Sequence, residues 1–229
     1  MGPPHRPCAL RSLLVTHTVF LFLALSLAAG ASALQPGLDR LAIDEALAIG
    51  QSRIEAVRTR FHQPYRIRVN RPPIDFIDIV TPFRRIEIEA ESRARAGNRS
   101  LSQREALAIL DTAGGDLDVF VEFTFHPLNT YIGVPDYEVS LMMGGRTPAL
   151  EIPPRTIQRI PRYGRRLEGL PLPYPVAPPV PRGSEPMLGG TVLAKFDLKG
   201  LDPNGVYDVA VKEAGKEMAR ARIDFRALR

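Results

Sequence analysis

Histidine, the side chain used most often for acid-base chemistry and metal binding, is scarce in this chain. Only His62 and His126 lie beyond residue 33, and they are 64 residues apart. A tetrahedral zinc site needs three or four ligands, commonly at short paired spacing, which two isolated histidines cannot supply alone. His126 follows Phe125 and precedes a proline, where we expect it to cap or line a loop. The sequence therefore predicts no metal site.

Paired aspartates are the next candidates for chemistry. Asp75 and Asp78 are three residues apart, which places them on opposite faces of a strand and makes them unsuited to a glycosidase pair. Asp116 and Asp118 could share a face and, with Asp111, offer oxygen ligands to calcium. The intervening residues lack the alternating ligand order of a calcium-binding helix-loop-helix. Turn chemistry explains these aspartates more simply, so we expect no calcium site.

Nucleophile and cofactor motifs are also missing from the sequence. No serine stands in Gly-x-Ser-x-Gly order, and neither Gly-x-x-x-x-Gly-Lys nor Gly-x-Gly-x-x-Gly occurs. A Ser-His-Asp site can be assembled from any chain order, so a hydrolase that uses His62 or His126 with a nearby aspartate remains an alternative. The main prediction is that the chain has no cofactor and no catalytic residue.

The helices expected from the sequence lie early in the chain. Apolar residues recur at helical intervals over residues 38–61, which predicts one or two amphipathic helices. Ser102 and Glu105 form a capping box that should open a short helix through Asp111, and Gly114 should stop it. Between these segments the prolines of residues 63–73 predict an extended connector.

Most of the remaining chain alternates apolar and polar side chains with the two-residue period of a strand that has one buried face. About seven short strands of this kind suit a sandwich of two antiparallel sheets, so the predicted fold is mainly β, an antiparallel β-sandwich with an amino-terminal helical segment and one inserted helix. The predicted strands cover residues 74–80, 86–91, 119–125, 137–142, 192–198, 207–211 and 219–225, with a turn at Ala214 and Gly215 joining the last two.

The segment between Pro148 and Pro186 holds 11 of the 22 prolines and an excess of arginine. Long segments of this kind are uncommon inside a domain and are often functional. Two interpretations stand: a loop strapped across the sandwich by its apolar side chains, or an exposed docking peptide in polyproline conformation. The binding residues predicted in this insertion, residues 147–187, are Arg159, Arg162, Tyr163, Arg165 and Arg166.

Residues 201–209, Leu-Asp-Pro-Asn-Gly-Val-Tyr-Asp-Val, resemble the tyrosine corner of fibronectin type III and related immunoglobulin-like sandwiches. In that motif a Leu-x-Pro turn, here Leu201 and Pro203, leads into a strand opened by a tyrosine whose hydroxyl bonds back to the chain, here Tyr207. The resemblance implies an immunoglobulin-like architecture, and such exported domains are usually adhesive, scaffolding or accessory modules. The chain has no tryptophan and no cysteine pair, so an antibody-type domain is not implied.

The amino terminus has the order of a secretory signal peptide. Arg6 and Arg11 precede an uncharged apolar stretch at residues 13–29, and small residues end at Ala33. The densest apolar part, residues 19–29, is about half of the roughly 20 residues that span a bilayer, so an uncleaved membrane anchor is the lesser alternative. The only cysteine, Cys8, would leave with the peptide.

Composition limits the function of residues 34–229. Beyond Ala33 there are 28 basic and 25 acidic residues, too small an excess to indicate nucleic-acid binding. Arginine outnumbers lysine strongly, which we interpret as the usage of a GC-rich bacterial genome. No cysteine is left, so packing and backbone pairing must stabilise the domain. We expect a periplasmic or secreted bacterial protein with no membrane insertion after cleavage.

The predicted organisation is a signal peptide at residues 1–33, a helical segment at 34–63 and a β-sandwich domain at 64–229. The lack of catalytic groups beside a long arginine-rich segment favours an exported non-catalytic module. Its predicted partner is a protein or an acidic polymer in the cell envelope. The alternative is the exported hydrolase with a histidine-carboxylate site.

Overall fold

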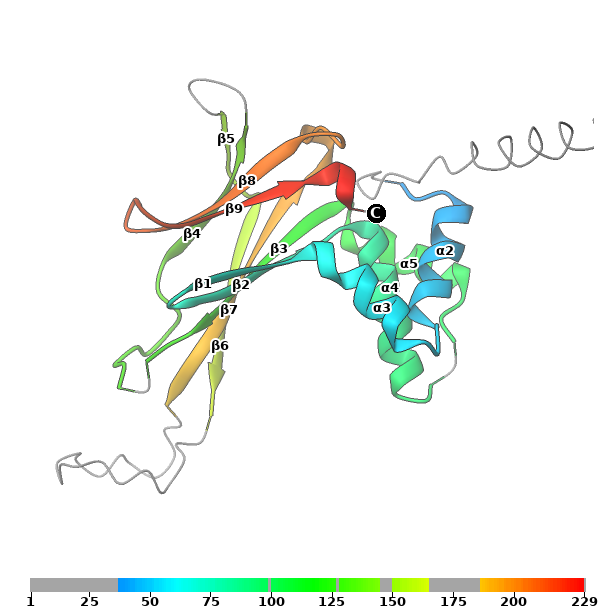
Figure 1. Ribbon diagram of the computed structural model, residues 1–229, viewed down its shortest axis with the longest axis horizontal. Helices are drawn as coiled ribbons and strands as arrows, with labels where there is room; N and C mark the ends of the chain where they lie inside the picture. Colours follow the sequence, from blue (N-terminus) through cyan, green and yellow to red (C-terminus); the bar gives the residue numbers. More distant parts are fainter. Residues whose placement is uncertain (1–36, 99, 127, 145–149, 165–185, 229) are drawn as a thin grey trace, which may run out of the picture. The chain divides into compact units, whose positions relative to one another are not determined.

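A computed structural model describes residues 37–98, 100–126, 128–144, 150–164 and 186–228 (Figure 1). They belong to a unit that spans residues 32–229. The predicted signal peptide, its cleavage site and the alternative anchor lie outside the described residues, as do Arg165 and Arg166. Within the described part of the chain, no helix combines the length and the hydropathy needed to cross a bilayer.

The described chain is mainly β and forms two antiparallel sheets. One sheet has the strand order β1-β2-β3-β7-β6 and the other the order β5-β4-β8-β9. The strands are β1 (Arg66–Arg71), β2 (Ile74–Val80), β3 (Asp116–Thr124), β4 (Tyr137–Met143), β5 (Leu150–Ile152), β6 (Thr156–Tyr163), β7 (Met187–Asp197), β8 (Val206–Glu213) and β9 (Lys216–Asp224).

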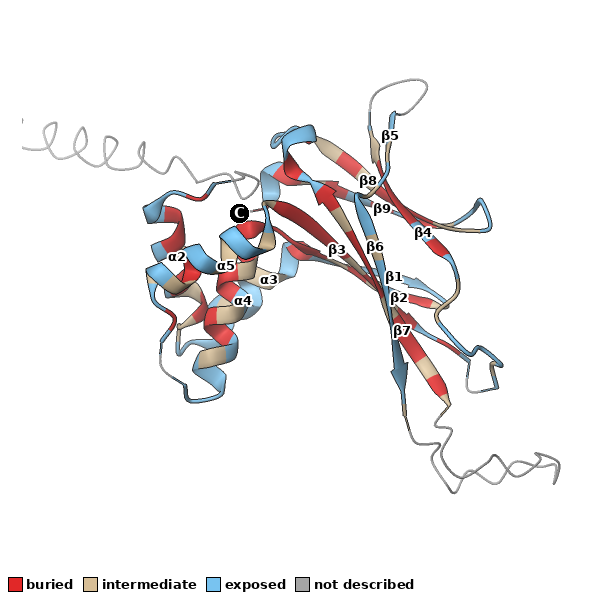
Figure 2. Cartoon of the chain, turned by 180° about the vertical axis from the view of Figure 1, so that it is seen from behind, coloured by how far each residue is buried: buried red, intermediate tan, exposed pale blue. Residues whose placement is uncertain are grey.

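The inward side chains of both sheets share one hydrophobic core. Phe123 of β3 stacks on Tyr137 of β4 with ring centroids 4.2 Å apart, which joins the two sheets directly. Figure 2 shows the buried residues concentrated along β3 and the exposed ones along β6. The alternation predicted for β3, β4, β7 and the β8–β9 hairpin is confirmed, because alternate side chains of these strands lie in this core. The strand predicted at residues 74–80 is confirmed as β2.

Four described helices accompany the sheets: α2 (Arg40–Gly50), α3 (Glu55–His62), α4 (Pro82–Arg95) and α5 (Gln103–Ala113). The Asp39 side chain accepts a hydrogen bond from the Ala42 amide at the start of α2. Both halves of the predicted capping box form between Ser102 and Glu105, and Gly114 ends α5 in the left-handed conformation. The predictions of helices in residues 38–61 and from Ser102 onward are therefore confirmed.

The strand predicted at residues 86–91 is wrong, because these residues form the middle of α4. Thr81 caps this helix by accepting a bond from the Arg84 amide, and Pro82 occupies its first turn. Phe83, Ile86 and Ala90 are fully buried at helical spacing, whereas Ile88 is exposed. The 3.6-residue period of a cap-initiated helix thus prevails over a two-residue alternation that is only six residues long.

Two further differences concern strands that contain or adjoin proline. Residues 66–71 form β1 rather than an extended connector, and residues 150–152 and 156–163 of the proline-rich segment form β5 and β6. The described chain therefore has nine strands rather than about seven. β1 and β6 are edge strands. Pro161 is tolerated in β6 because a proline on an edge can leave its missing amide hydrogen on the unpaired side.

The helices are not confined to the amino-terminal segment. α4 and α5 follow one another between the paired strands β2 and β3, and α2 packs against α4. Gly50, the last residue of α2, lies so close to α4 that an added Cβ would clash with the Glu87 carbonyl oxygen. α2 and α3, which lie in the segment predicted to be helical, therefore build one helical layer with α4 and α5.

Candidate functional site

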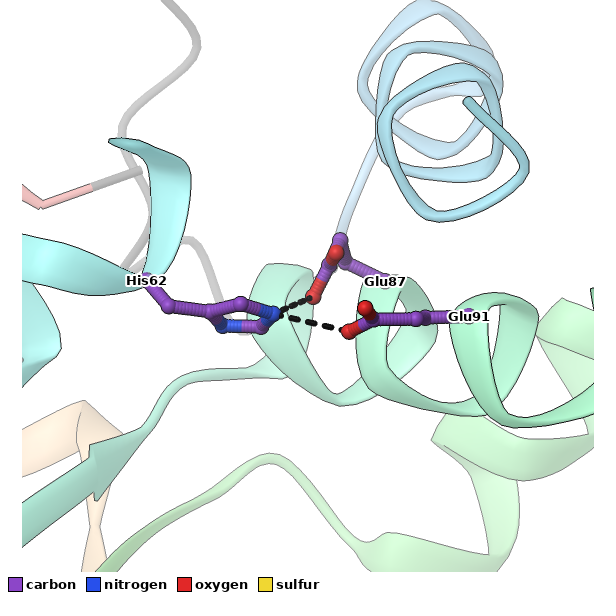
Figure 3. Close-up of side chains that lie close together, drawn as sticks. All are labelled: His62, Glu87 and Glu91. Carbon is purple, nitrogen blue, oxygen red and sulfur yellow. Dashed lines mark hydrogen bonds and ion pairs between the residues drawn. The ribbon is translucent and has the colours of Figure 1, made fainter. Parts of the chain in front are cut away.

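Three side chains that could bind a cation meet between α3 and α4 (Figure 3). His62 is the last residue of α3, while Glu87 and Glu91 lie four residues apart on one face of α4. His62 Nε2 is 3.0 Å from Glu91 Oε2 and 3.3 Å from Glu87 Oε2. Their ligand atoms all lie within 4.8 Å of one another. We call these three residues the His-Glu-Glu cluster.

Glu87 is the most constrained member of the cluster. Its side chain is 0% exposed, and neither carboxylate oxygen has a hydrogen-bond partner. Burial, with a smaller contribution from the neighbouring Glu91 charge, raises the pKa of Glu87 from 4.5 to about 8. At neutral pH and without a bound cation, Glu87 therefore holds its proton.

The pKa of Glu91 is shifted in the opposite direction. Its Oε1 accepts hydrogen bonds from Arg58 Nε at 2.8 Å and from an Arg95 amino group at 2.6 Å. Burial alone would raise the pKa of Glu91, but the hydrogen bond from His62 and the charges and bonds of Arg95 and Arg58 hold it below its ordinary value. Glu91 is ionised at neutral pH, and its Oε2 is the oxygen that faces His62.

Arg84 determines which nitrogen of His62 carries hydrogen. Its Nε donates to His62 Nδ1 across 3.3 Å. Because a guanidinium can only donate, Nδ1 must be the acceptor and Nε2 carries the hydrogen that faces the two glutamates. A second Arg84 nitrogen donates to Asp78 and to the Ile79 carbonyl, both at 2.5 Å, so β2 holds Arg84 in place.

Both nitrogens of the imidazole are therefore engaged inside the protein. A general base must accept a proton from substrate or water through a free nitrogen. His62 offers none in this arrangement, although imidazole nitrogen with two carboxylates is a donor set typical of divalent metal ions.

The two aspartate pairs considered from the sequence, Asp75 with Asp78 and Asp116 with Asp118, are bound to basic side chains or a hydroxyl. Asp116 accepts from Arg155 at 2.7 Å. Asp118 accepts from Arg85 at 2.7 Å and lies 3.5 Å from Lys195 Nζ. Asp75 accepts from the Thr124 hydroxyl, and Asp78 pairs with Arg84 and Arg66. These contacts hold α4 and the edge strands to the sheet.

The described residues of the predicted arginine-rich binding set, Arg159, Arg162 and Tyr163, lie on β6. Arg159 donates to the Tyr137 carbonyl at 3.2 Å and lies 3.3 Å from Asp136. Arg162 donates to the Phe123 carbonyl at 2.9 Å. Arg159 thus contacts the other sheet, whereas Arg162 bonds within its own sheet. Tyr163, by contrast, is 51% exposed.

Tyr207 makes the local contact of a tyrosine corner. Its ring is fully buried at the start of β8, and its hydroxyl accepts a hydrogen bond from the Asp202 amide at 2.8 Å. Leu201 is buried and Pro203 is exposed on the turn before it.

The loop between β3 and β4 carries a group of exposed apolar side chains that sequence reasoning missed. Leu128, Tyr131 and Ile132 are exposed there, Ile132 to 97%. His126 Nδ1 accepts from the Leu128 amide, as expected for a histidine that caps a loop. Asn129 donates to the Met187 carbonyl, and Met187 pairs with Tyr163 of β6. We call Leu128, Tyr131, Ile132 and Tyr163 the apolar end.

Sequence reasoning also missed Glu87 and Glu91. The signal was their four-residue spacing, which indicates a shared helix face once residues 82–95 are recognised as a helix. Nothing local to His62 points to them, because the contact is made by packing of α3 on α4.

No family model, curated protein or solved structure matches this chain. Its function must therefore be inferred from its geometry.

Proposed function

We propose that this chain is an exported, non-catalytic binding module with an immunoglobulin-like β-sandwich, which docks a protein partner through the apolar end. The observation that carries the proposal is the exposure of four large apolar side chains at that end, with Ile132 97% exposed.

The strand order supports the immunoglobulin-like part of the proposal. Such sandwiches place strands A-B-E-D in one sheet and C-F-G in the other, with C′ beside C in some types. The orders β2-β3-β7-β6 and β5-β4-β8-β9 correspond to A-B-E-D and C′-C-F-G. In this correspondence Tyr207 opens strand F, the place of the tyrosine corner. β1 and the four helices are additions to that framework.

The same correspondence supports the choice of binding surface. The loop at residues 126–136 joins β3 to β4 and is thus the B–C loop, one of those that variable immunoglobulin domains use for recognition. Tyr131 packs edge-on against Phe125 with centroids 4.9 Å apart, which anchors the loop while Ile132 stays outside. Apolar side chains gathered on a supported loop are typical of a protein-docking surface.

The contacts of the arginines favour a protein over an acidic polymer as partner. Arg159 and Arg162 donate to carbonyls of the sandwich, so their donors are partly used within the fold. An apolar end with tyrosines is better matched to an apolar pocket on a protein.

The engaged nitrogens of His62 favour a binding function over hydrolysis, because neither nitrogen is free to accept a proton.

Site-specific photo-crosslinking tests this function. A photo-reactive residue at position 132 should capture one partner in the native host, whereas the same residue at position 41 should not. Leu41 is a matched control because it is 79% exposed on α2. Excess unlabelled protein should compete, and Leu128→Asp or Tyr163→Asp should abolish capture with unchanged circular dichroism. Equal capture from positions 132 and 41, or capture that survives both substitutions, would refute the proposal.

A further inference from the structure

Glu87 differs from the other buried charged or polar residues in its lack of hydrogen bonds. Among the described residues it is the only side chain for which two buried terminal atoms have no hydrogen-bond partner. Buried polar groups are nearly always hydrogen-bonded, and an unsatisfied one calls for a specific reason. A buried carboxyl group without a hydrogen bond, aimed at a histidine and a carboxylate, is the donor arrangement expected of a cation site once that group gives up its proton (Figure 3).

The spacing of the donor atoms fits a small ion. With bonds of about 2.1 Å, two neighbouring ligand atoms of a tetrahedral site lie ~3.4 Å apart. His62 Nε2 lies 3.0 Å and 3.3 Å from the facing oxygens of Glu91 and Glu87. Small side-chain movements would therefore bring all three atoms onto one ion.

We propose that His62 Nε2, Glu87 and Glu91 bind one divalent transition-metal ion of the zinc class. Imidazole nitrogen selects a borderline metal such as zinc over calcium or magnesium, which prefer oxygen ligands only. Two carboxylates balance its charge. This site is independent of the docking surface proposed above, because it is built entirely from α3 and α4.

The surroundings of Glu91 fit this role. Arg58 and Arg95 both bind its Oε1, which orients the carboxylate and leaves Oε2 directed at the cluster. A cavity of about 170 Å³ adjoins Glu91 and is lined by residues 50–53 together with Arg58 and Arg95.

The hydrogen bond from Arg84 to His62 opposes metal binding and lowers the affinity of the cluster for the ion. A metal at Nε2 displaces the hydrogen from that nitrogen, so Nδ1 must then carry one, and it would face the Arg84 Nε hydrogen. Metal-bound histidines normally donate this hydrogen to a carboxylate or carbonyl. Metal binding would break the long Arg84–His62 hydrogen bond of 3.3 Å and replace the His62–Glu91 hydrogen bond with bonds to the ion, whereas Arg84 keeps its bonds to Asp78 and Ile79.

Zinc titration of the full chain, purified without a histidine tag and stripped with chelator, tests the site. Calorimetry should give one equivalent of bound Zn²⁺, and X-ray absorption should show a nitrogen and oxygen shell at about 2.0–2.1 Å. Glu87→Gln should weaken binding by roughly 100-fold or more. Glu89→Gln is the matched control, since Glu89 is on the same helix but pairs with Arg93 at 2.9 Å.

Equal loss in both variants, no loss in Glu87→Gln, or a wild-type protein that takes up no zinc at neutral pH would each overturn the proposal. Circular dichroism of Glu87→Gln separates loss of a ligand from loss of the fold. This substitution keeps the shape of the side chain and replaces a carboxyl group that is already neutral in the metal-free protein, so the variant is expected to fold.

Discussion

Glu87 and Glu91 carry the same chemical group four residues apart and are held in opposite protonation states. The difference follows from their partners: Glu91 accepts from Arg58 and Arg95, whereas Glu87 accepts from no donor and is completely buried. Pairs of groups whose surroundings separate their pKa values are typical of functional sites. The same pair can hold a proton or, together with His62, a metal ion.

The stability of the metal-free protein should depend on pH through Glu87. Its pKa is raised from 4.5 to about 8 on folding, so between these pH values the unfolded chain releases a proton that the folded chain keeps. The stabilisation is complete below pH 4.5 and is lost as the pH rises through about 8. At about 1.4 kcal/mol per pKa unit the loss is at most several kcal/mol.

Denaturant unfolding in the presence of chelator measures this effect. The difference in unfolding free energy between wild type and Glu87→Gln cancels the other titrating groups. It should fall from acid to mildly alkaline pH, and a difference that is constant or rises over this interval would contradict the assignment.

Arg84→Gln should tighten zinc binding. The glutamine amide oxygen can accept the Nδ1 hydrogen that the guanidinium opposes, and such outer partners of a ligand histidine change metal affinity by about 10- to 100-fold. In this variant the Asp78 carboxylate still pairs with Arg66 at 3.0 Å, so its negative charge remains compensated. Competition with a zinc-sensitive dye gives the affinity. An unchanged or lower affinity in a folded variant would contradict the role given to Arg84.

At the scale of elements, the approach of α2 to α4 controls the position of Glu87. Gly50→Ala should destabilise the protein by about 1–3 kcal/mol, because the new Cβ would clash with the Glu87 carbonyl oxygen and force the helices apart. Intrinsic helix propensity alone predicts the opposite sign. Gly37→Ala is the control, since no atom lies within 4 Å of its added Cβ. Thermal unfolding of both variants measures the difference, and equal midpoints would show that the contact relaxes freely.

The elements also show where sequence patterns succeed. The capping box at Ser102 and the β8–β9 hairpin depend on contacts between residues close in sequence, and both are predicted correctly. Residues 86–91 satisfy a two-residue period and, when Phe83 is included, a helical one. Burial against α2 decides between them, and burial is not a local property.

At the scale of the whole molecule, the two proposed sites use separate parts of the fold. The His-Glu-Glu cluster belongs to helices at the amino-terminal side of the chain, and the apolar end belongs to the β3–β4 loop and β6. Neither site shares a residue with the other.

By itself the sequence determined the mainly β fold, most of the strands, three of the four described helices and the turn around Tyr207, because periodicity, caps and turn residues act over a few residues. It also indicated that histidine is scarce. Only the tertiary structure decided that His62 meets Glu87 and Glu91, that Arg159 and Arg162 bond within the sheets, and that Ile132 stays outside. Such contacts join residues 20 or more positions apart. Packing of distant segments selects the partners, and the spacing of nearby residues cannot predict that packing.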